Sequence, residues 1–129
     1  MKGVTILGST GSIGVNTLDV ISRHSDKYKV KALTANTNVE TLQEQCVKHL
    51  PEFAVMVDES AAEKLEKALK QKAPDVTVLS GIDGLLKVVE LVGVDYVMAA
   101  IVGAAGLLPT LAAARSSKRV LLANKEALV

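Results

Sequence analysis

The residues best suited to chemistry in this sequence form a glycine-rich loop near the N-terminus. Gly8, Gly11 and Gly14 follow a short apolar run at the spacing G-x-x-G-x-x-G. The first glycine permits a sharp turn, the second lets a phosphate approach the backbone, and the third lets a helix pack closely. The N–H groups of residues 10–13 would point at an anion, helped by the dipole of the following helix. Three hydroxyl groups are expected to donate as well: Ser9, Thr10 and Ser12.

A glycine turn that binds no ligand is the alternative interpretation of this loop. A glycine motif alone is a weak signal, but this one follows the first expected strand and opens the first expected helix, as a dinucleotide site requires. The P-loop of nucleoside triphosphatases is excluded, because G-x-x-x-x-G-K-[ST] occurs nowhere in the sequence. We therefore expect the loop to bind the pyrophosphate of a dinucleotide.

The end of the second expected strand bears on which dinucleotide is bound. An acidic residue there binds the ribose 2′-hydroxyl of NAD and repels the 2′-phosphate of NADP. Here the strand is followed by Asn36, Thr37 and Asn38, with no acidic residue, which favours NADP. No Lys or Arg occurs in this stretch, so amide, hydroxyl and helix N-terminal N–H groups would hold the 2′-phosphate. These three residues also suit a turn and helix cap that touches no cofactor.

The elements that must position these loops alternate along the chain. Short apolar runs predict strands over 4–7, 29–35, 53–57, 76–79, 96–100 and 120–123. Amphipathic spacing predicts helices over 12–24, 38–49, 61–72, 83–91 and 107–115, with Val39, Leu42, Cys46 and Leu50 on one face of the second. Strand–helix alternation with strands that are apolar throughout indicates a Rossmann-type, doubly wound α/β fold. Its sheet would be mainly parallel, with helices on both faces.

Composition limits the organisation and the partners. The 129 residues suit one domain, residues 1–129, and 49% of them are hydrophobic, which excludes intrinsic disorder. Fifteen basic residues stand against fourteen acidic ones and aromatic residues are few, so we expect no nucleic-acid partner. The longest apolar stretch, 97–108, is too short to span a bilayer, so we expect no membrane partner. A single cysteine, Cys46, favours a reducing compartment, the cytoplasm.

Three stretches, residues 6–14, 97–111 and 121–129, closely resemble the 1-deoxy-D-xylulose 5-phosphate reductoisomerase family. The resemblance runs over the whole chain and corresponds to the N-terminal NADPH-binding domain of the family. It implies a parent enzyme of the non-mevalonate isoprenoid pathway. That enzyme would rearrange its substrate and reduce it with NADPH to 2-C-methyl-D-erythritol 4-phosphate.

The resemblance also implies roles for individual residues. Thr10, Gly11, Ser12 and Ile13 match the pyrophosphate loop, and Asn36, Thr37 and Asn38 match the segment at the adenosine ribose and its 2′-phosphate. Several members carry Gly and a basic residue at positions 36 and 37. Ala100 and Ile101 match a strand end along the cofactor, Asn124 and Glu126 match cofactor contacts, and Lys125 matches a substrate contact. From the residues alone, 124–126 is equally well a helix cap with a charge pair.

The resemblance further implies a homodimeric parent and a divalent metal, Mg²⁺ or Mn²⁺. In the family, the carboxylates that hold the metal follow the stretch at which this chain stops. We therefore expect a fragment that has neither metal ligands nor catalytic residues and that is inactive alone. Asp58 and Glu59 more plausibly cap a helix than bind a metal, and the two histidines, His24 and His49, are expected at the surface.

Three other interpretations of the sequence remain as alternatives. A short-chain dehydrogenase needs Y-x-x-x-K, but Tyr28 is followed by Ala32 and Tyr96 by Ala100, so its catalytic pair is absent. A semialdehyde dehydrogenase needs a nucleophilic cysteine at the ligand edge, whereas Cys46 is expected on the apolar face of a helix. A non-catalytic dinucleotide-binding module that is complete in itself would share the same fold and glycine loop.

Overall fold

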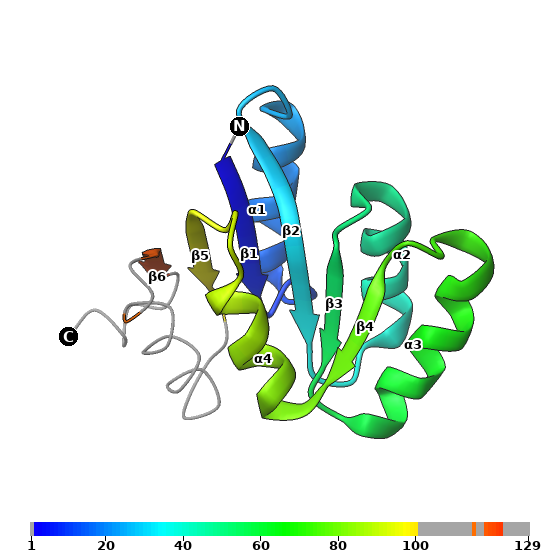
Figure 1. The fold of residues 1–129 in the computed structure, drawn as a ribbon. Coiled ribbons are helices and arrows are strands. Elements are labelled where there is room, and N and C mark those ends of the chain that lie inside the picture. Colours follow the sequence, from blue (N-terminus) through cyan, green and yellow to red (C-terminus); the bar gives the residue numbers. More distant parts are fainter. Residues whose placement is uncertain (1, 101–114, 116–117, 123–129) are drawn as a thin grey trace.

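The computed structural model describes residues 2–100, 115 and 118–122. Their strands form one sheet in the order β4-β3-β2-β1-β5-β6, and every neighbouring pair is parallel (Figure 1). The strands are β1 (Lys2–Leu7), β2 (Tyr28–Ala35), β3 (Phe53–Met56), β4 (Thr77–Ser80), β5 (Tyr96–Ala99) and β6 (Arg119–Leu122). The helices are α1 (Ser12–Arg23), α2 (Val39–His49), α3 (Glu59–Lys72) and α4 (Gly81–Glu90). The expected doubly wound α/β architecture is confirmed, while most of the expected helix 107–115 lies outside the described residues.

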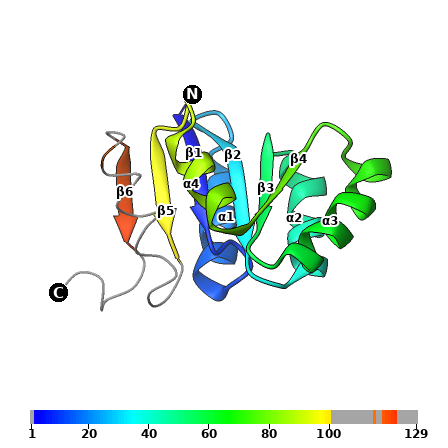
Figure 2. The ribbon, with the colours of Figure 1, turned by 60° about the horizontal axis from the view of Figure 1, so that its bottom comes forward.

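The helices cover both faces of the sheet (Figure 2). On one face, α1, α2 and α3 pack in a single core with side chains such as Ile6 and Leu33. On the other, α4 packs in a second core with Leu7 and Val55, which are fully buried. Because successive side chains of a strand point to opposite faces, a strand covered on both faces must be apolar throughout. This explains the continuous apolar runs in the sequence.

The strand order reverses direction beside β1, where the ligand edge of such a sheet is expected. After β1 the chain adds β2, β3 and β4 outward on one side, and α4 then returns it to place β5 on the other side of β1 (Figure 1). At the end of this pair, the N–H of Ala100 donates to the carbonyl oxygen of Leu7 at 2.9 Å. In open α/β sheets, ligands bind outside the carboxyl ends of the strands at this switch point.

Two of the helices begin at side-chain caps that the sequence predicted. The Asn38 side chain accepts from the N–H of Thr41 at 3.2 Å, and the Asp58 carboxylate accepts from the N–H of Ala61 at 2.9 Å. Each cap satisfies one N–H of a first helical turn, where no backbone partner exists. The prediction that Leu50 lies on the apolar face of α2 is wrong. Leu50 follows the end of the helix, takes a positive φ of 49° and is exposed.

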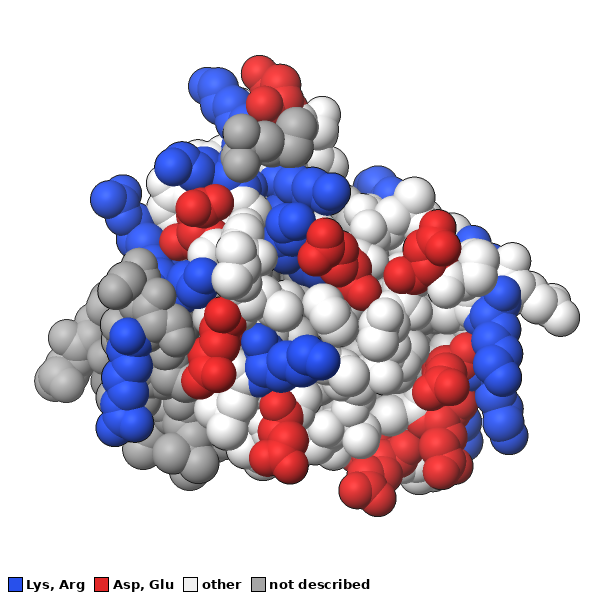
Figure 3. Space-filling model, in the orientation of Figure 1, with Lys and Arg blue, Asp and Glu red and all other residues white. Residues whose placement is uncertain are grey.

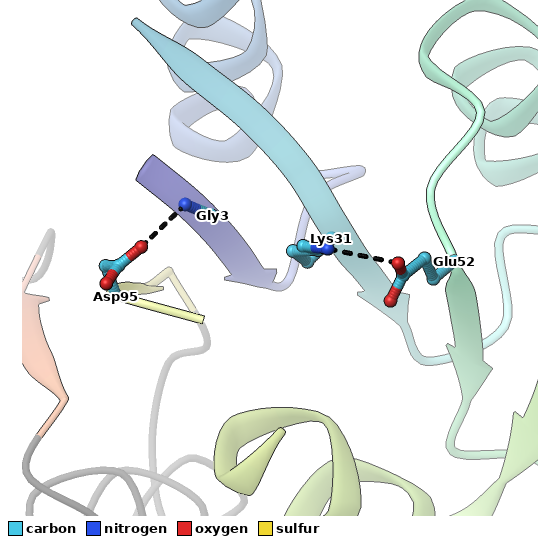
Figure 4. Close-up of polar contacts among 4 residues, drawn as sticks. All are labelled: Gly3, Lys31, Glu52 and Asp95. Carbon is cyan, nitrogen blue, oxygen red and sulfur yellow. Dashed lines mark hydrogen bonds and ion pairs between the residues drawn. The ribbon is translucent and has the colours of Figure 1, made fainter. Parts of the chain in front are cut away.

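Polar contacts connect residues in and beside the central strands, away from the glycine loop (Figure 4). Gly3 and Asp95 form a reciprocal pair: the Asp95 carboxylate accepts from the N–H of Gly3 at 2.9 Å, and the N–H of Asp95 donates to the Gly3 carbonyl at 2.8 Å. Lys31 of β2 pairs with Glu52 at 3.0 Å. These contacts lie at the end of the sheet opposite the glycine loop, so they bear on stability and not on the ligand edge.

Charges of both signs are spread over the face shown in Figure 3. Lys and Arg side chains are most frequent toward the amino ends of the strands, and Asp and Glu line the lower edge. No helix in the described part of the chain is long and apolar enough to cross a membrane.

Candidate functional site

The glycine-rich loop leaves β1 through a turn that glycine favours. Gly8 has a φ of 80°, in the left-handed region where a side chain is disfavoured. Its N–H donates to the Thr34 hydroxyl on β2 at 2.9 Å, so the neighbouring strand fixes the start of the loop. The chain then turns directly into α1, as the glycine spacing predicts.

The other two glycines of the motif have different surroundings. A β-carbon on Gly14 would lie 2.5 Å from the Cα of Ser9 and would also overlap the Gly8 carbonyl oxygen. Gly14 therefore lets α1 pack closely, as the motif predicts, and its neighbour is the turn that follows β1. Among the described residues, a β-carbon on Gly11 would meet only that same oxygen, at 3.8 Å. No other described atom lies close over Gly11, as is required if a phosphate is to approach the backbone there.

The residues around Gly11 present donors at the start of α1. Gly11 is the N-terminal cap of α1, and as a glycine it has no side chain that could cap the helix. Gly11, Ser12 and Ile13 are exposed, and Thr10 is partly exposed. The first N–H groups of a helix have no partner within it, and no described residue accepts from those of Ser12 and Ile13. They can therefore bind an anion, and the helix dipole favours negative charge there. The geometry therefore suits the expected pyrophosphate contact.

Ser9 was expected to donate its hydroxyl to the ligand, but its side chain forms hydrogen bonds inside the protein instead. Its side chain is fully buried and turned away from the ligand edge. The hydroxyl donates to the side-chain oxygen of Gln45 on α2 at 2.8 Å and lies 3.2 Å from the Thr34 carbonyl oxygen. A hydroxyl that already donates inside the protein is not available to a ligand, so only Thr10 and Ser12 remain as expected hydroxyl donors.

Asn36, Thr37 and Asn38 connect β2 to α2 at the same edge of the sheet, and all three are exposed. Because β1 and β2 are adjacent and parallel, this segment and the glycine loop follow neighbouring strand ends. Asn38 caps α2 through its side-chain oxygen, which leaves its NH₂ group as a donor. Lys and Arg are absent from residues 8–22 and 32–47, so in these two segments only N–H, amide and hydroxyl groups could hold phosphate.

Of the remaining expected contact residues, some lie within the described part of the chain and others lie outside it. Ala100 is described, and its hydrogen bond to Leu7 places it at the switch point beside β1. Ile101, Asn124, Lys125 and Glu126 lie outside the described residues.

The other described residues that could do chemistry do not form a site. Burial raises the pKa of the Cys46 thiol from 9.0 to about 12, so this cysteine is a buried, unreactive thiol. The pKa of His49 is lowered, chiefly by burial and then by the charge of Lys48. His24 ends α1 and His49 ends α2. Among the described residues, no group of three His, Cys, Asp or Glu side chains could hold a metal ion.

Thr34 and Gln45 belong to the loop's surroundings but were missed by the sequence analysis. The Thr34 carbonyl accepts from the N–H of Ser9 at 2.8 Å, and Gln45 donates to the carbonyl of Ser9 at 2.8 Å. A signal for Gln45 does exist, since it lies three residues after Leu42 and beside Cys46, both buried residues of α2. A polar side chain at that spacing needs a partner inside the protein.

Known proteins of one family are similar to this chain. A family model described as 1-deoxy-D-xylulose 5-phosphate reductoisomerase matches residues 4–129. Reductoisomerases of that name from Nitrosomonas europaea and Nitrosococcus oceani are 60% and 57% identical over 99% and 100% of this chain. The matched region makes up 31% and 33% of those proteins. The chain therefore spans about a third of the length of these curated relatives.

Solved structures of such enzymes share the fold. The reductoisomerase of Zymomonas mobilis in complex with NADPH superposes with a TM-score of 0.90 at 46% identity, over 98% of this chain and 33% of that one. A reductoisomerase in complex with NADPH, fosmidomycin and magnesium superposes with a TM-score of 0.93 at 41% identity, over 99% and 31%.

Proposed function

The chain belongs to the 1-deoxy-D-xylulose 5-phosphate reductoisomerase family, and on that premise we propose that residues 1–129 are its NADPH-binding unit. The observation that carries the proposal is the backbone of Gly11, which no described side chain covers, at the start of α1 and beside the switch point of the sheet. A solved relative that shares this fold is in complex with NADPH. Bound NADPH would supply the hydride for a reduction.

We assign the pyrophosphate of NADPH to the loop Thr10, Gly11, Ser12 and Ile13. The support is the N–H groups at the start of α1, the helix dipole and the room that the described residues leave over Gly11. We assign the adenosine ribose and its 2′-phosphate to Asn36, Thr37 and Asn38. The support is their exposure, the lack of an acidic residue, and the N-terminus of α2 directly after them.

The proposal extends to residues outside the described part of the chain. Asn124 and Glu126 would contact the cofactor, and Lys125 would contact the sugar phosphate. A divalent metal in the parent enzyme is supported by a relative solved with magnesium, but the described residues of this chain do not suit one. No step of the reaction is therefore assigned to the metal or to catalytic residues of this chain.

For the whole parent protein we propose the reaction that the family is named for. It would rearrange 1-deoxy-D-xylulose 5-phosphate and reduce the product with NADPH to 2-C-methyl-D-erythritol 4-phosphate. We further propose a cytoplasmic homodimer that contacts neither nucleic acid nor a membrane. The single cysteine of these 129 residues, Cys46, allows no internal disulfide, which supports a reducing compartment.

Calorimetry with the 129-residue chain tests the cofactor assignment. We expect NADPH to bind, and NADH to bind more weakly because it lacks the 2′-phosphate assigned to residues 36–38. NADH binding as tight as NADPH would contradict that assignment, and no binding of either would favour a structural module. A second assay adds 1-deoxy-D-xylulose 5-phosphate, NADPH and Mn²⁺, and there we expect no turnover. Turnover above background would show that the chain carries catalytic groups of its own.

A further inference from the structure

Gln45 forms a reciprocal pair with Ser9, the residue that precedes the proposed anion-binding donors. Its side-chain oxygen accepts from the Ser9 hydroxyl at 2.8 Å, and its NH₂ group donates to the Ser9 carbonyl at 2.8 Å. The two residues are 36 positions apart in the sequence. One side chain of α2 thus holds both the side chain and the backbone of one loop residue.

Thr34 accepts the hydrogen bonds that this part of the loop donates from its backbone. The Thr34 carbonyl accepts from the N–H of Ser9 at 2.8 Å, and its hydroxyl accepts from the N–H of Gly8 at 2.9 Å. Ser9 is fully buried, and all of its polar groups have partners. Since hydrogen bonds with defined geometry fix Ser9 from both sides, the N–H groups that follow it start from a fixed backbone.

We propose that Gln45 is a positioning residue for the dinucleotide site, holding the glycine loop in the conformation that receives the pyrophosphate. The inference rests on the proposed NADPH site and adds a residue to it that touches no ligand. A loop that is already fixed avoids the cost of ordering when the anion binds, so its affinity is higher. Without Gln45, the Ser9 carbonyl would lose its partner and the loop would take up other conformations.

Helix α2 also connects the two halves of that site. Asn38 caps its first turn and belongs to the segment assigned to the 2′-phosphate. Gln45 follows two turns later on the same helix and hydrogen-bonds to Ser9, which directly precedes the segment assigned to the pyrophosphate. A single helix therefore sets the position of one phosphate-binding segment relative to the other. This makes Gln45 more than a local packing residue.

The substitution Gln45→Met tests the proposal, because methionine keeps the length of the side chain and favours a helix but cannot form the two hydrogen bonds. The matched control is Gln43→Met on the same helix, since the described residues offer no hydrogen bond to the Gln43 side chain. NADPH affinity is measured by calorimetry for both variants and for the unsubstituted 129-residue chain, called the parent chain below. Amide hydrogen exchange of residues 8–13 is measured by NMR without cofactor.

We expect Gln45→Met to bind NADPH about tenfold more weakly, the effect of roughly one to two lost hydrogen bonds, and its loop amides to exchange faster. Gln43→Met should match the parent chain in both measurements. Equal NADPH affinity of Gln45→Met and the parent chain would overturn the proposal, whatever the loop amides show. If Gln45→Met does not fold, Ser9→Ala removes one of the two hydrogen bonds and should act in the same direction; parent-like affinity and loop exchange would overturn the proposal.

Failure of the proposed function gives a different pattern. If the parent chain does not bind NADPH, the cofactor assignment fails. The exchange rates of the loop amides without cofactor then decide whether Gln45 holds the loop in place. Faster exchange in Gln45→Met alone would still support its hold on the loop. Unchanged exchange would overturn the positioning role as well.

Discussion

Gly14 lies so close to the Gly8 carbonyl that no β-carbon can be placed between them. The clash would involve backbone on both sides, because a β-carbon on Gly14 would also lie 2.5 Å from the Cα of Ser9. Backbone atoms cannot rotate away as the end of a side chain can. The first turn of α1 and the turn after β1 are therefore one tightly packed unit, and the third glycine of the motif is required by packing.

Gly14→Ala is expected to lower the free energy of unfolding by up to about 2 kcal/mol. Alanine in place of glycine favours a helix by about 1 kcal/mol, but forcing an extra carbon into a packed site costs about 1–3 kcal/mol and displaces the turn. Urea unfolding followed by circular dichroism measures the difference. Gly11→Ala is the control, because its β-carbon meets only ordinary contact distance, and a Gly14→Ala variant as stable as this control would refute the packing role.

Gly11→Val should separate binding from folding. The φ of −76° and ψ of 170° at Gly11 are accessible to valine, so we expect a stability loss of about 1 kcal/mol or less, from the weaker helix cap. The valine methyl groups would occupy the space assigned to the pyrophosphate, and NADPH binding should fall at least about tenfold, a loss of about 1.4 kcal/mol of binding free energy. Calorimetry and thermal unfolding on one sample test both parts. Retained affinity would show that the cofactor does not pass over Gly11.

Much of the fold could be predicted because the sequence is locally consistent. The strand runs are apolar on both faces, and Asn38 and Asp58 cap helices at positions where their types favour a cap. Leu50 was assigned to the buried face of α2 because its spacing continues the apolar pattern. The helix ends one residue earlier and Leu50 turns to positive φ, so periodicity fails where the helix stops.

The site was predicted less completely, and Ser9 shows why. Its position between glycines makes it look like a ligand donor, but which way its side chain points depends on β2 and α2, which are distant in sequence. Thr34 and Gln45 take up its hydrogen-bonding groups from 25 and 36 residues away. Local spacing can indicate that a loop binds an anion, but it cannot tell which hydroxyl the tertiary structure has already used.

Asp95→Ala is expected to destabilise the protein by about 1–2 kcal/mol. The substitution removes the carboxylate that accepts from the N–H of Gly3, and hydrogen bonds to charged groups contribute about 1.5–3 kcal/mol when protected from water. Asp95 is exposed, which puts the expectation at the low end of that range. Urea unfolding measures it, with Asp75→Ala as the control at another exposed aspartate. Equal midpoints for the two variants would mean that the Asp95 contact contributes nothing.

Cys46 is expected to make the folded chain less stable at high pH. Burial raises the pKa of its thiol from 9.0 to about 12, so above pH 9 the unfolded chain loses this proton while the folded chain keeps it. The unfolded state then binds fewer protons, and the free energy of unfolding falls by about 1.4 kcal/mol for each pH unit between the two pKa values. Below pH 9 the thiol contributes no slope. Urea titrations from pH 8 to pH 11 on the parent chain and on Cys46→Ala measure the effect, because other groups titrate alike in both proteins. Parallel stability curves for the two proteins would show that the thiol ionises as easily in the folded chain as in the unfolded one.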